Sequence, residues 1–126
     1  MLRPFERKAS VVVWDDTKIR SGSIWREEIR RALESAKVAV LLVSSHFLAS
    51  EFIANHELVP LLDAAQKGGL RIIWVAVSQC MYEETEIEKY QAANVPTVPL
   101  DTLPRAAQDK VLRSICDTIK QAIHSP

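Results

Sequence analysis

Three runs of apolar residues along the chain have the pattern of buried β-strands. Residues 38–43 are apolar at every position, and residues 72–77 form an equally continuous run. Residues 11–14 are β-branched and aromatic, and a polar segment beginning at Asp15 follows them. Strands that are apolar on both sides are typical of parallel sheets covered by helices. The three runs therefore predict a parallel sheet with two covered faces.

Helical patterns alternate with these strands. After Ser23, a residue suited to capping, apolar residues recur at spacings of four, four and three, at Trp25, Ile29, Leu33 and Ala36. The segment that begins at Pro104 carries apolar residues at helical spacing, namely Val111, Leu112, Ile115, Ile119 and Ile123. Alternating strands and helices predict an α/β fold of flavodoxin-like type, a three-layer parallel sheet.

A further helix follows the strand at 38–43. Ser50 is a candidate cap with Glu51 in the first turn, which places Glu57 about two turns into the helix. Pro60 lacks an N–H and crowds the preceding turn, so a kink or a restart is expected beside Glu57. Glu57 is then either a carboxylate aimed into the crevice at the strand ends, or an ordinary surface acid with Pro60 opening a second short helix.

The rest of the chain is less regular. A short helix is expected around residues 84–91, and Pro96 and Pro99 bracket at most a short edge strand. No repeat, low-complexity tract or flexible linker is visible along the chain. The sequence therefore predicts a single domain over residues 1–126.

The charge pattern and composition exclude several classes of protein. Sixteen basic and sixteen acidic side chains balance, and no basic stripe suggests nucleic acid or a membrane surface as partner. The longest apolar run has six residues, against about 20 for a spanning helix, and no signal region precedes it. Cys80 and Cys116 lack metal-ligand spacing and are interpreted as reduced thiols. A cytoplasmic protein is expected.

Familiar catalytic motifs are missing. Glycines occur only at positions 22, 68 and 69, so neither a dinucleotide fingerprint nor a phosphate loop can form. An acidic pair after the first strand would suit a phosphoacceptor or metal site, but the later strands end in Ser44-Ser45 and Ser78-Gln79, without a further acid or lysine. The three histidines, His46, His56 and His124, are scattered. No metal site is expected.

Several ordered blocks nevertheless resemble a bacterial Toll/interleukin-1 receptor (TIR) domain. The blocks are residues 14–29, 36–44 and 47–53, followed by Glu57-Leu58. By this resemblance, Glu57 corresponds to the catalytic glutamate of NAD-cleaving members. Residues 15–23 would form the loop that makes domain contacts and borders the nucleotide site; its candidate interaction residues are Asp15, Asp16, Lys18, Ile19, Arg20 and Gly22.

The resemblance also implies substrate-binding positions, at Ser44, Ser45, Ile53 and Trp25. Ile53 stands where several active members carry tryptophan, which implies less stacking surface for the substrate. Trp25, like Trp74, is alternatively a core residue, because its spacing requires nothing more.

A single carboxylate suits cleavage of NAD, which would be a substrate and not a cofactor. The nicotinamide ring of NAD is already a cationic pyridinium and leaves as neutral nicotinamide, so its departure needs no general acid, in contrast to ordinary two-carboxylate glycosidases. Glu57 would hold the ribose hydroxyls and stabilise the oxocarbenium-like transition state. The resemblance thus implies a defence or innate-immunity signalling hydrolase that acts when TIR domains self-assemble.

Two other functions compete with this hypothesis. The first is a non-catalytic TIR adaptor that acts in signal transduction through residues 15–23 and the helix around 26–34. The second is a nucleoside-processing transferase of similar α/β shape, against which the block at residues 14–29 argues.

One departure from the family affects the sheet. The family's first strand lies between the two strands that here begin near Val11 and Val38, and this sequence starts after it. A gap would expose two strand edges, which folded proteins avoid. Three solutions are open: the coding sequence begins further upstream, which we expect; the strand at 11–14 pairs directly with that at 38–43; or another chain supplies the strand.

Overall fold

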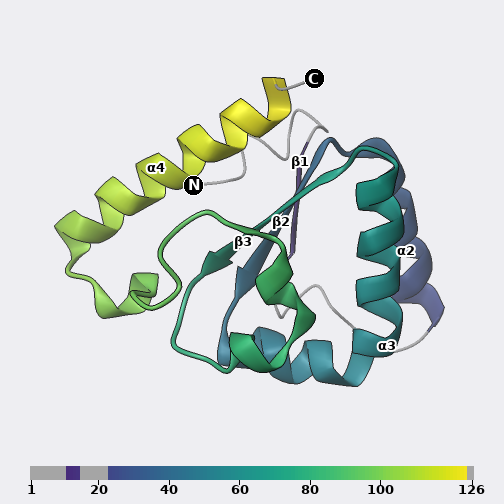
Figure 1. The fold of residues 1–126 in the computed structure, drawn as a ribbon, viewed down its shortest axis with the longest axis horizontal. Coiled ribbons are helices and arrows are strands. Elements are labelled where there is room, and N and C mark those ends of the chain that lie inside the picture. Colours follow the sequence, from purple (N-terminus) through teal and green to yellow (C-terminus); the bar gives the residue numbers. More distant parts are fainter. Residues whose placement is uncertain (1–10, 15–22, 125–126) are drawn as a thin grey trace.

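A parallel four-stranded sheet forms the centre of the molecule (Figure 1). The computed structural model describes residues 11–14 and 23–124, with the backbone alone for 23–26, 28 and 50–59. The sheet has the order β1-β2-β3-β4, with strands at Val11–Trp14, Val38–Val43, Arg71–Ala76 and Gln91–Ala92. This arrangement confirms the predicted flavodoxin-like α/β fold.

Strand β1 pairs directly with β2. Val11 lies opposite Val38, and the parallel register continues to Trp14 opposite Leu41. The gap expected between these two strands is therefore absent. Direct pairing, one of the solutions considered, is what these strands show, and it satisfies backbone groups that a gap would leave without partners.

In the described part of the chain, three long helices cover the two faces of the sheet. They are α2 (Ser23–Ser35), α3 (Ser45–Lys67) and α4 (Arg105–His124). Each crossover from β1 to β3 advances by one strand in the same direction, so the right-handed rule places α2 and α3 on one face. Helix α4 lies on the opposite face (Figure 1). The fold thus has the three layers expected.

Alternate residues of β2 serve two separate cores. Ala39, Leu41 and Val43 belong to the core under α2 and α3, whereas Val38 and Val40 belong to the core under α4. All five are fully buried, since successive side chains of a strand point to opposite faces. This two-sided burial explains why the run at 38–43 has no polar position.

Helix α3 begins earlier than the sequence predicted. Its N-cap is Ser44, which has an extended backbone conformation and whose hydroxyl oxygen accepts a hydrogen bond from the Phe47 N–H at 3.1 Å. Ser50, the expected cap, lies inside the helix. The prediction failed because both serines precede apolar helical residues. Glu57 consequently lies more than three turns into α3, and not two.

Pro60 does not divide α3. The helix continues through this residue to Lys67, so the expected restart and the alternative of a second helix beginning at Pro60 are both wrong. One proline removes a single backbone hydrogen bond, which tertiary packing can offset. The helix still changes direction along its length, since its first turns run beside the carboxyl edge of the sheet and its last turns beside α2 (Figure 1).

Smaller differences concern the ends of elements. Strand β3 spans Arg71–Ala76, one residue earlier than the predicted 72–77. Two 3₁₀ turns, Tyr82–Glu84 and Glu86–Lys89, replace the short helix expected at 84–91. The edge strand precedes Pro96 instead of lying between Pro96 and Pro99, and a third 3₁₀ turn spans Leu100–Thr102.

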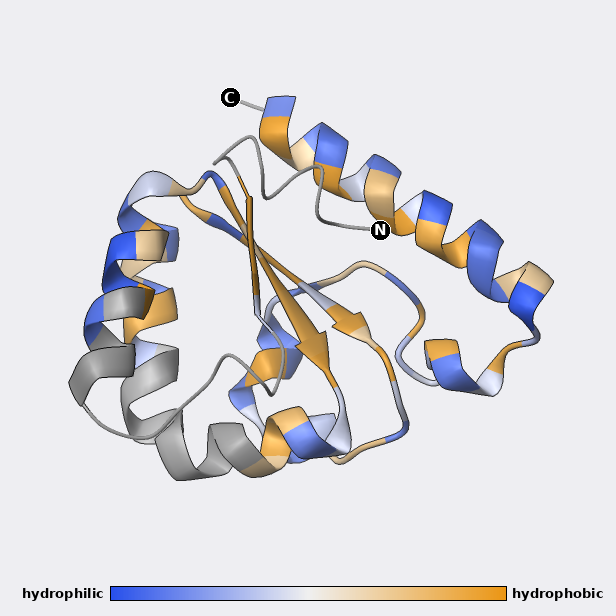
Figure 2. Cartoon of the chain, turned by 180° about the vertical axis from the view of Figure 1, so that it is seen from behind, coloured by the Kyte–Doolittle hydropathy of each residue, from blue (hydrophilic) through white to orange (hydrophobic). Residues whose placement is uncertain are grey.

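The helices mix apolar and hydrophilic positions, as the alternating colours along α4 show (Figure 2). Over residues 11–14 and 23–124, no helix combines the length and apolar character needed to cross a bilayer. Cys80 and Cys116 are both free thiols, as predicted.

Candidate functional site

A pocket of about 560 Å³ opens at the carboxyl edge of the sheet. Its walls come from the first turns of α3 and from the segment that follows β3; the lining residues are Ser45, Leu48, Ala49, Gln79, Cys80, Met81 and Glu83. Crevices at the carboxyl ends of parallel strands are the usual ligand sites of open α/β sheets. This pocket is therefore the candidate site.

The amino terminus of α3 forms one side of the pocket. The Ser45 N–H donates to the Ser78 hydroxyl at 3.4 Å, which joins the start of α3 to the residues after β3. The helix dipole gives this end a partial positive charge that favours anionic groups. A phosphate-bearing ligand would therefore be stabilised on this side.

The opposite wall combines the apolar Met81 and the protonated thiol of Cys80 with the polar Gln79 and the acidic Glu83. Burial raises the pKa of the Cys80 thiol above its ordinary value, so the group is not a thiolate near neutral pH. Met81 beside it is 62% exposed, an unusual position for a large apolar side chain. The wall offers contact surface for an apolar ring and does not offer a cysteine nucleophile.

An aromatic pair, the buried Trp74 and the half-buried Tyr82, lies next to this wall. The Trp74 indole N–H donates to the Tyr90 carbonyl at 3.0 Å, and the Trp74 ring lies 5.2 Å from that of Tyr82. Trp74 is 1% exposed, which confirms its predicted role in the core. Burial raises the pKa of the Tyr82 hydroxyl. The segment after β3 is thus fixed to the sheet.

Helix α3 is fastened to the same segment further along its length. Asp63 accepts hydrogen bonds from the Lys89 ammonium at 2.8 Å and from the Tyr90 hydroxyl at 2.7 Å. The bonds from Lys89 and Tyr90 hold the pKa of the Asp63 carboxyl below its ordinary value. The two sides of the pocket, α3 and the segment after β3, are therefore joined by hydrogen bonds at Ser78 and at Asp63.

The structure places one of the predicted site residues, Ser45, at the pocket. Ser45 lines the pocket, whereas Ser44 caps α3 and is not among the lining residues. Ile53 and Glu57 are both residues of α3, and Trp25 is a residue of α2, but their side chains lie outside the described part of the chain. The predicted interaction loop, apart from Ser23, also lies outside it.

Six lining residues were missed by the sequence analysis as site residues. They are Leu48 and Ala49 of α3 and, after β3, Gln79, Cys80, Met81 and Glu83. The signal for the last four was position, because Ser78-Gln79 closes a strand and so lies at the ligand-binding edge. Among the side chains that the structure describes, no group of three or more histidine, cysteine, aspartate or glutamate residues is arranged to hold a metal ion.

Comparison with protein families gives one match. Residues 5–116 match the model of the TIR domain. A comparison with curated proteins and another with solved structures each found no match. The family match covers most of the chain and agrees with the parallel sheet and flanking helices. The chain therefore belongs to the TIR-domain family.

Proposed function

We propose that this TIR domain cleaves the nicotinamide–ribosyl bond of NAD when it self-assembles, with Glu57 as the catalytic carboxylate. NAD is the substrate, and the reaction needs no cofactor. Family membership makes the chain a signalling or defence module, and TIR domains commonly self-associate. The NAD chemistry goes beyond that membership and is the proposal.

The observation that supports the proposal is a pocket at the carboxyl edge of the sheet beside α3. The pocket lies against the first turns of α3, the helix that contains Glu57. Ala49 lines the pocket, and positions 53 and 57 follow it at intervals of four, the spacing of neighbours along one side of a helix. This spacing supports a site in which the same side of α3 supplies Ile53 and Glu57.

Each wall of the pocket suits one part of NAD. The amino terminus of α3 at Ser45 favours the negative pyrophosphate. The apolar surface of Met81 and the neutral thiol of Cys80 suit a flat ring. These properties support a dinucleotide spanning the pocket from Ser45 toward Met81.

The proposed reaction needs one carboxylate. The C1′–N bond breaks with both electrons passing to the pyridinium nitrogen, so neutral nicotinamide leaves without a proton. Positive charge then develops on the ribose ring, where the Glu57 carboxylate stabilises it. Water adds to C1′ and loses a proton, which gives ADP-ribose; attack by an internal nucleophile of the substrate gives a cyclic product instead.

A second candidate function is that of a non-catalytic adaptor acting through TIR–TIR contacts. The observation that favours it is the strand order. Doubly wound folds bind ligands where the strand order reverses, and the described sheet runs from β1 to β4 without a reversal. An adaptor would use its surfaces for assembly and would leave NAD intact.

One experiment separates the two functions. The purified chain is concentrated under crowding conditions, assembly is followed by light scattering, and NAD, nicotinamide and ADP-ribose are quantified by chromatography. Glu57→Gln removes the proposed charge, and Glu51→Gln makes the same change in the same helix as a matched control. We expect the native chain and Glu51→Gln to form product, and Glu57→Gln to form none. Assembly without product from the native chain would favour the adaptor.

A further inference from the structure

One acidic side chain lines the candidate site. Glu83 is the only charged residue among the described residues that line the pocket. It lies in the segment after β3, on the wall opposite the amino terminus of α3 at Ser45. The helix dipole makes the Ser45 side positive, whereas the Glu83 carboxylate makes the other wall negative. The two walls of the pocket therefore favour different parts of a charged ligand.

The backbone that carries Glu83 is anchored to the sheet. Tyr82, the preceding residue, packs its ring against the buried Trp74, with the ring centroids 5.2 Å apart. The Tyr82 carbonyl accepts hydrogen bonds from the Thr85 N–H at 3.0 Å and from the Thr85 hydroxyl at 2.7 Å, which close the turn containing Glu83. Burial, and after it the charge of Glu83, raises the pKa of the Tyr82 hydroxyl. The turn thus holds the carboxylate beside the pocket.

The segment around Glu83 carries little positive charge to offset it. Between residues 79 and 90 the charged side chains are Glu83, Glu84, Glu86, Glu88 and Lys89. Lys89 is bound to Asp63 at 2.8 Å and lies 4.0 Å from Glu86. The one basic residue of the segment is therefore engaged with carboxylates already, and the wall after β3 stays negative.

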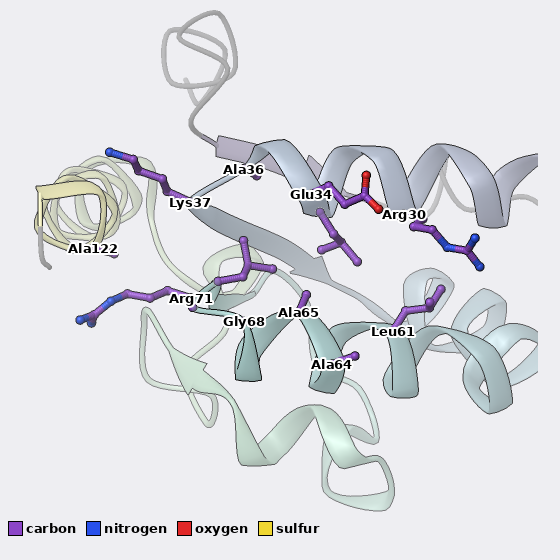
Figure 3. A pocket seen from close by; sticks show the side chains of 13 residues that line it. Arg30, Glu34, Ala36, Lys37, Leu61, Ala64, Ala65, Gly68, Arg71 and Ala122 are labelled. Carbon is purple, nitrogen blue, oxygen red and sulfur yellow. The ribbon is translucent and has the colours of Figure 1, made fainter.

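Two other basic residues, Lys37 and Arg71, line a separate cavity of about 770 Å³ at the amino edge of the sheet (Figure 3). A six-residue strand separates the two edges by about 20 Å, which exceeds the Debye length of about 8 Å at physiological ionic strength. Arg30, which lines the same cavity, forms an ion pair with Glu27 at 3.3 Å. These cations do not neutralise charge at the candidate site.

A carboxylate in this position distinguishes two kinds of dinucleotide. It accepts a hydrogen bond from a free ribose 2′-hydroxyl, but it repels a 2′-phosphate, which carries up to about two negative charges near neutral pH. In the arrangement proposed above, the pyrophosphate lies at Ser45 and the reacting ribose lies toward Glu57. The adenosine half of the dinucleotide then faces the segment after β3, where Glu83 lies.

We therefore propose, resting on the proposed function, that Glu83 determines substrate specificity by selecting dinucleotides with a free 2′-hydroxyl on the adenosine ribose. NAD has this hydroxyl, and NADP carries a phosphate in its place. Glu83 accepts the hydroxyl proton in a hydrogen bond and takes no part in the cleavage of the nicotinamide–ribosyl bond. The site thus excludes NADP by charge.

Two measurements on the full chain under assembly conditions test the proposal. The first is the ratio of kcat/KM for NAD to that for NADP. The second needs no catalysis: equilibrium dialysis compares the binding of ADP-ribose with that of ADP-ribose 2′-phosphate, which differ in the 2′-phosphate alone. We expect the native chain to prefer the compound without the 2′-phosphate at least about ten-fold in both measurements.

Three variants locate the preference. Glu83→Gln removes the charge at nearly constant size, so the preference should fall to about three-fold or less. Glu83→Arg supplies a phosphate-binding group and should reverse it. Glu84→Gln makes the same charge change at the exposed neighbouring position, which is not among the lining residues, and should leave the preference unchanged. Circular dichroism shows that each variant is folded.

The outcomes separate this proposal from NAD cleavage itself. Equal use of NAD and NADP by the native chain, or the same preference in Glu83→Gln as in the native chain, would overturn the role of Glu83 and leave NAD cleavage standing. A Glu83-dependent preference in dialysis without cleavage of NAD would support that role and contradict the catalytic proposal. Binding of neither compound and cleavage of neither dinucleotide would overturn both.

Discussion

The Asn94 side chain holds both backbone groups of Ala76. Its Oδ1 accepts the Ala76 N–H at 2.8 Å, and its Nδ2 donates to the Ala76 carbonyl at 3.0 Å. Strand β4 has only two residues, so it cannot pair with the end of β3. The amide of Asn94 therefore replaces one position of the ladder and closes the end of β3, directly before the residues that line the candidate site.

We expect Asn94→Ala to destabilise the fold by about 1–3 kcal/mol, because it leaves two backbone groups of the buried Ala76 without partners. Asn94→Asp keeps the acceptor and loses the donor, so it should also destabilise. Urea denaturation measures both changes, with Gln121→Ala on exposed α4 surface as control. Equal stability of Asn94→Ala and the native chain would show that these two bonds contribute little.

The start of α3 gives a second prediction. Ser44→Ala removes the N-cap and should cost about 0.5–2 kcal/mol, whereas Ser50→Ala lies inside the helix and should change stability by less than about 0.5 kcal/mol. Thermal unfolding followed by circular dichroism compares the two substitutions. A larger loss from Ser50→Ala would place the start of the helix where the sequence had suggested it.

The contact of Asp63 with Lys89 and Tyr90 predicts a dependence of stability on pH. The pKa of Asp63 is lower in the folded chain than in the unfolded chain, so its contribution is complete above about pH 4 and is lost as the pH falls through the folded value. Asp63 is more than one third exposed, and water screens the pair. Asp63→Asn should therefore cost only about 0.5–1 kcal/mol at pH 7.

Urea titrations at pH 7 and pH 3 check this expectation, with Asp109→Asn as an exposed control on α4. The difference between Asp63→Asn and the native chain should shrink at the lower pH. A difference that stays constant or grows between pH 7 and pH 3 would contradict the assignment of the effect to the Asp63 carboxylate.

The thiol in the candidate site gives a fourth prediction. Because burial raises the pKa of Cys80, its alkylation by iodoacetamide should be slow at neutral pH and should accelerate at pH values above its ordinary pKa. A Cys116→Ser background confines the reaction to Cys80. NAD should slow alkylation further if it occupies this pocket. Fast alkylation at pH 7 would reveal a thiolate and contradict the neutral Cys80 thiol assigned to this wall.

The sequence predicted the strands best where burial is most complete. The run at 38–43 is apolar throughout because both faces of β2 are covered, and this pattern located the strand to the residue. The buried residues Ile115 and Ile119 likewise fall on the predicted apolar side of α4. In these elements local pattern and tertiary burial agree.

The pairing of Val11 with Val38 was harder to predict. It joins residues far apart in the chain, and no local pattern of either strand specifies its neighbour. The family's usual strand order suggested a gap between β1 and β2, but the two strands pair directly through their backbones. The pocket was difficult for a related reason, since Gln79, Cys80 and Met81 carry no motif and become a wall only because α3 starts beside them.

The most direct measurement is the ratio of kcat/KM for NAD cleavage between the native assembled chain and Glu57→Gln, with circular dichroism to show that both are folded. We expect a ratio of at least about 10²–10³, the usual loss on removing one electrostatic stabiliser of a transition state. Equal activity of Glu57→Gln, or no cleavage of NAD by the folded and assembled native chain, would contradict Glu57-dependent catalysis.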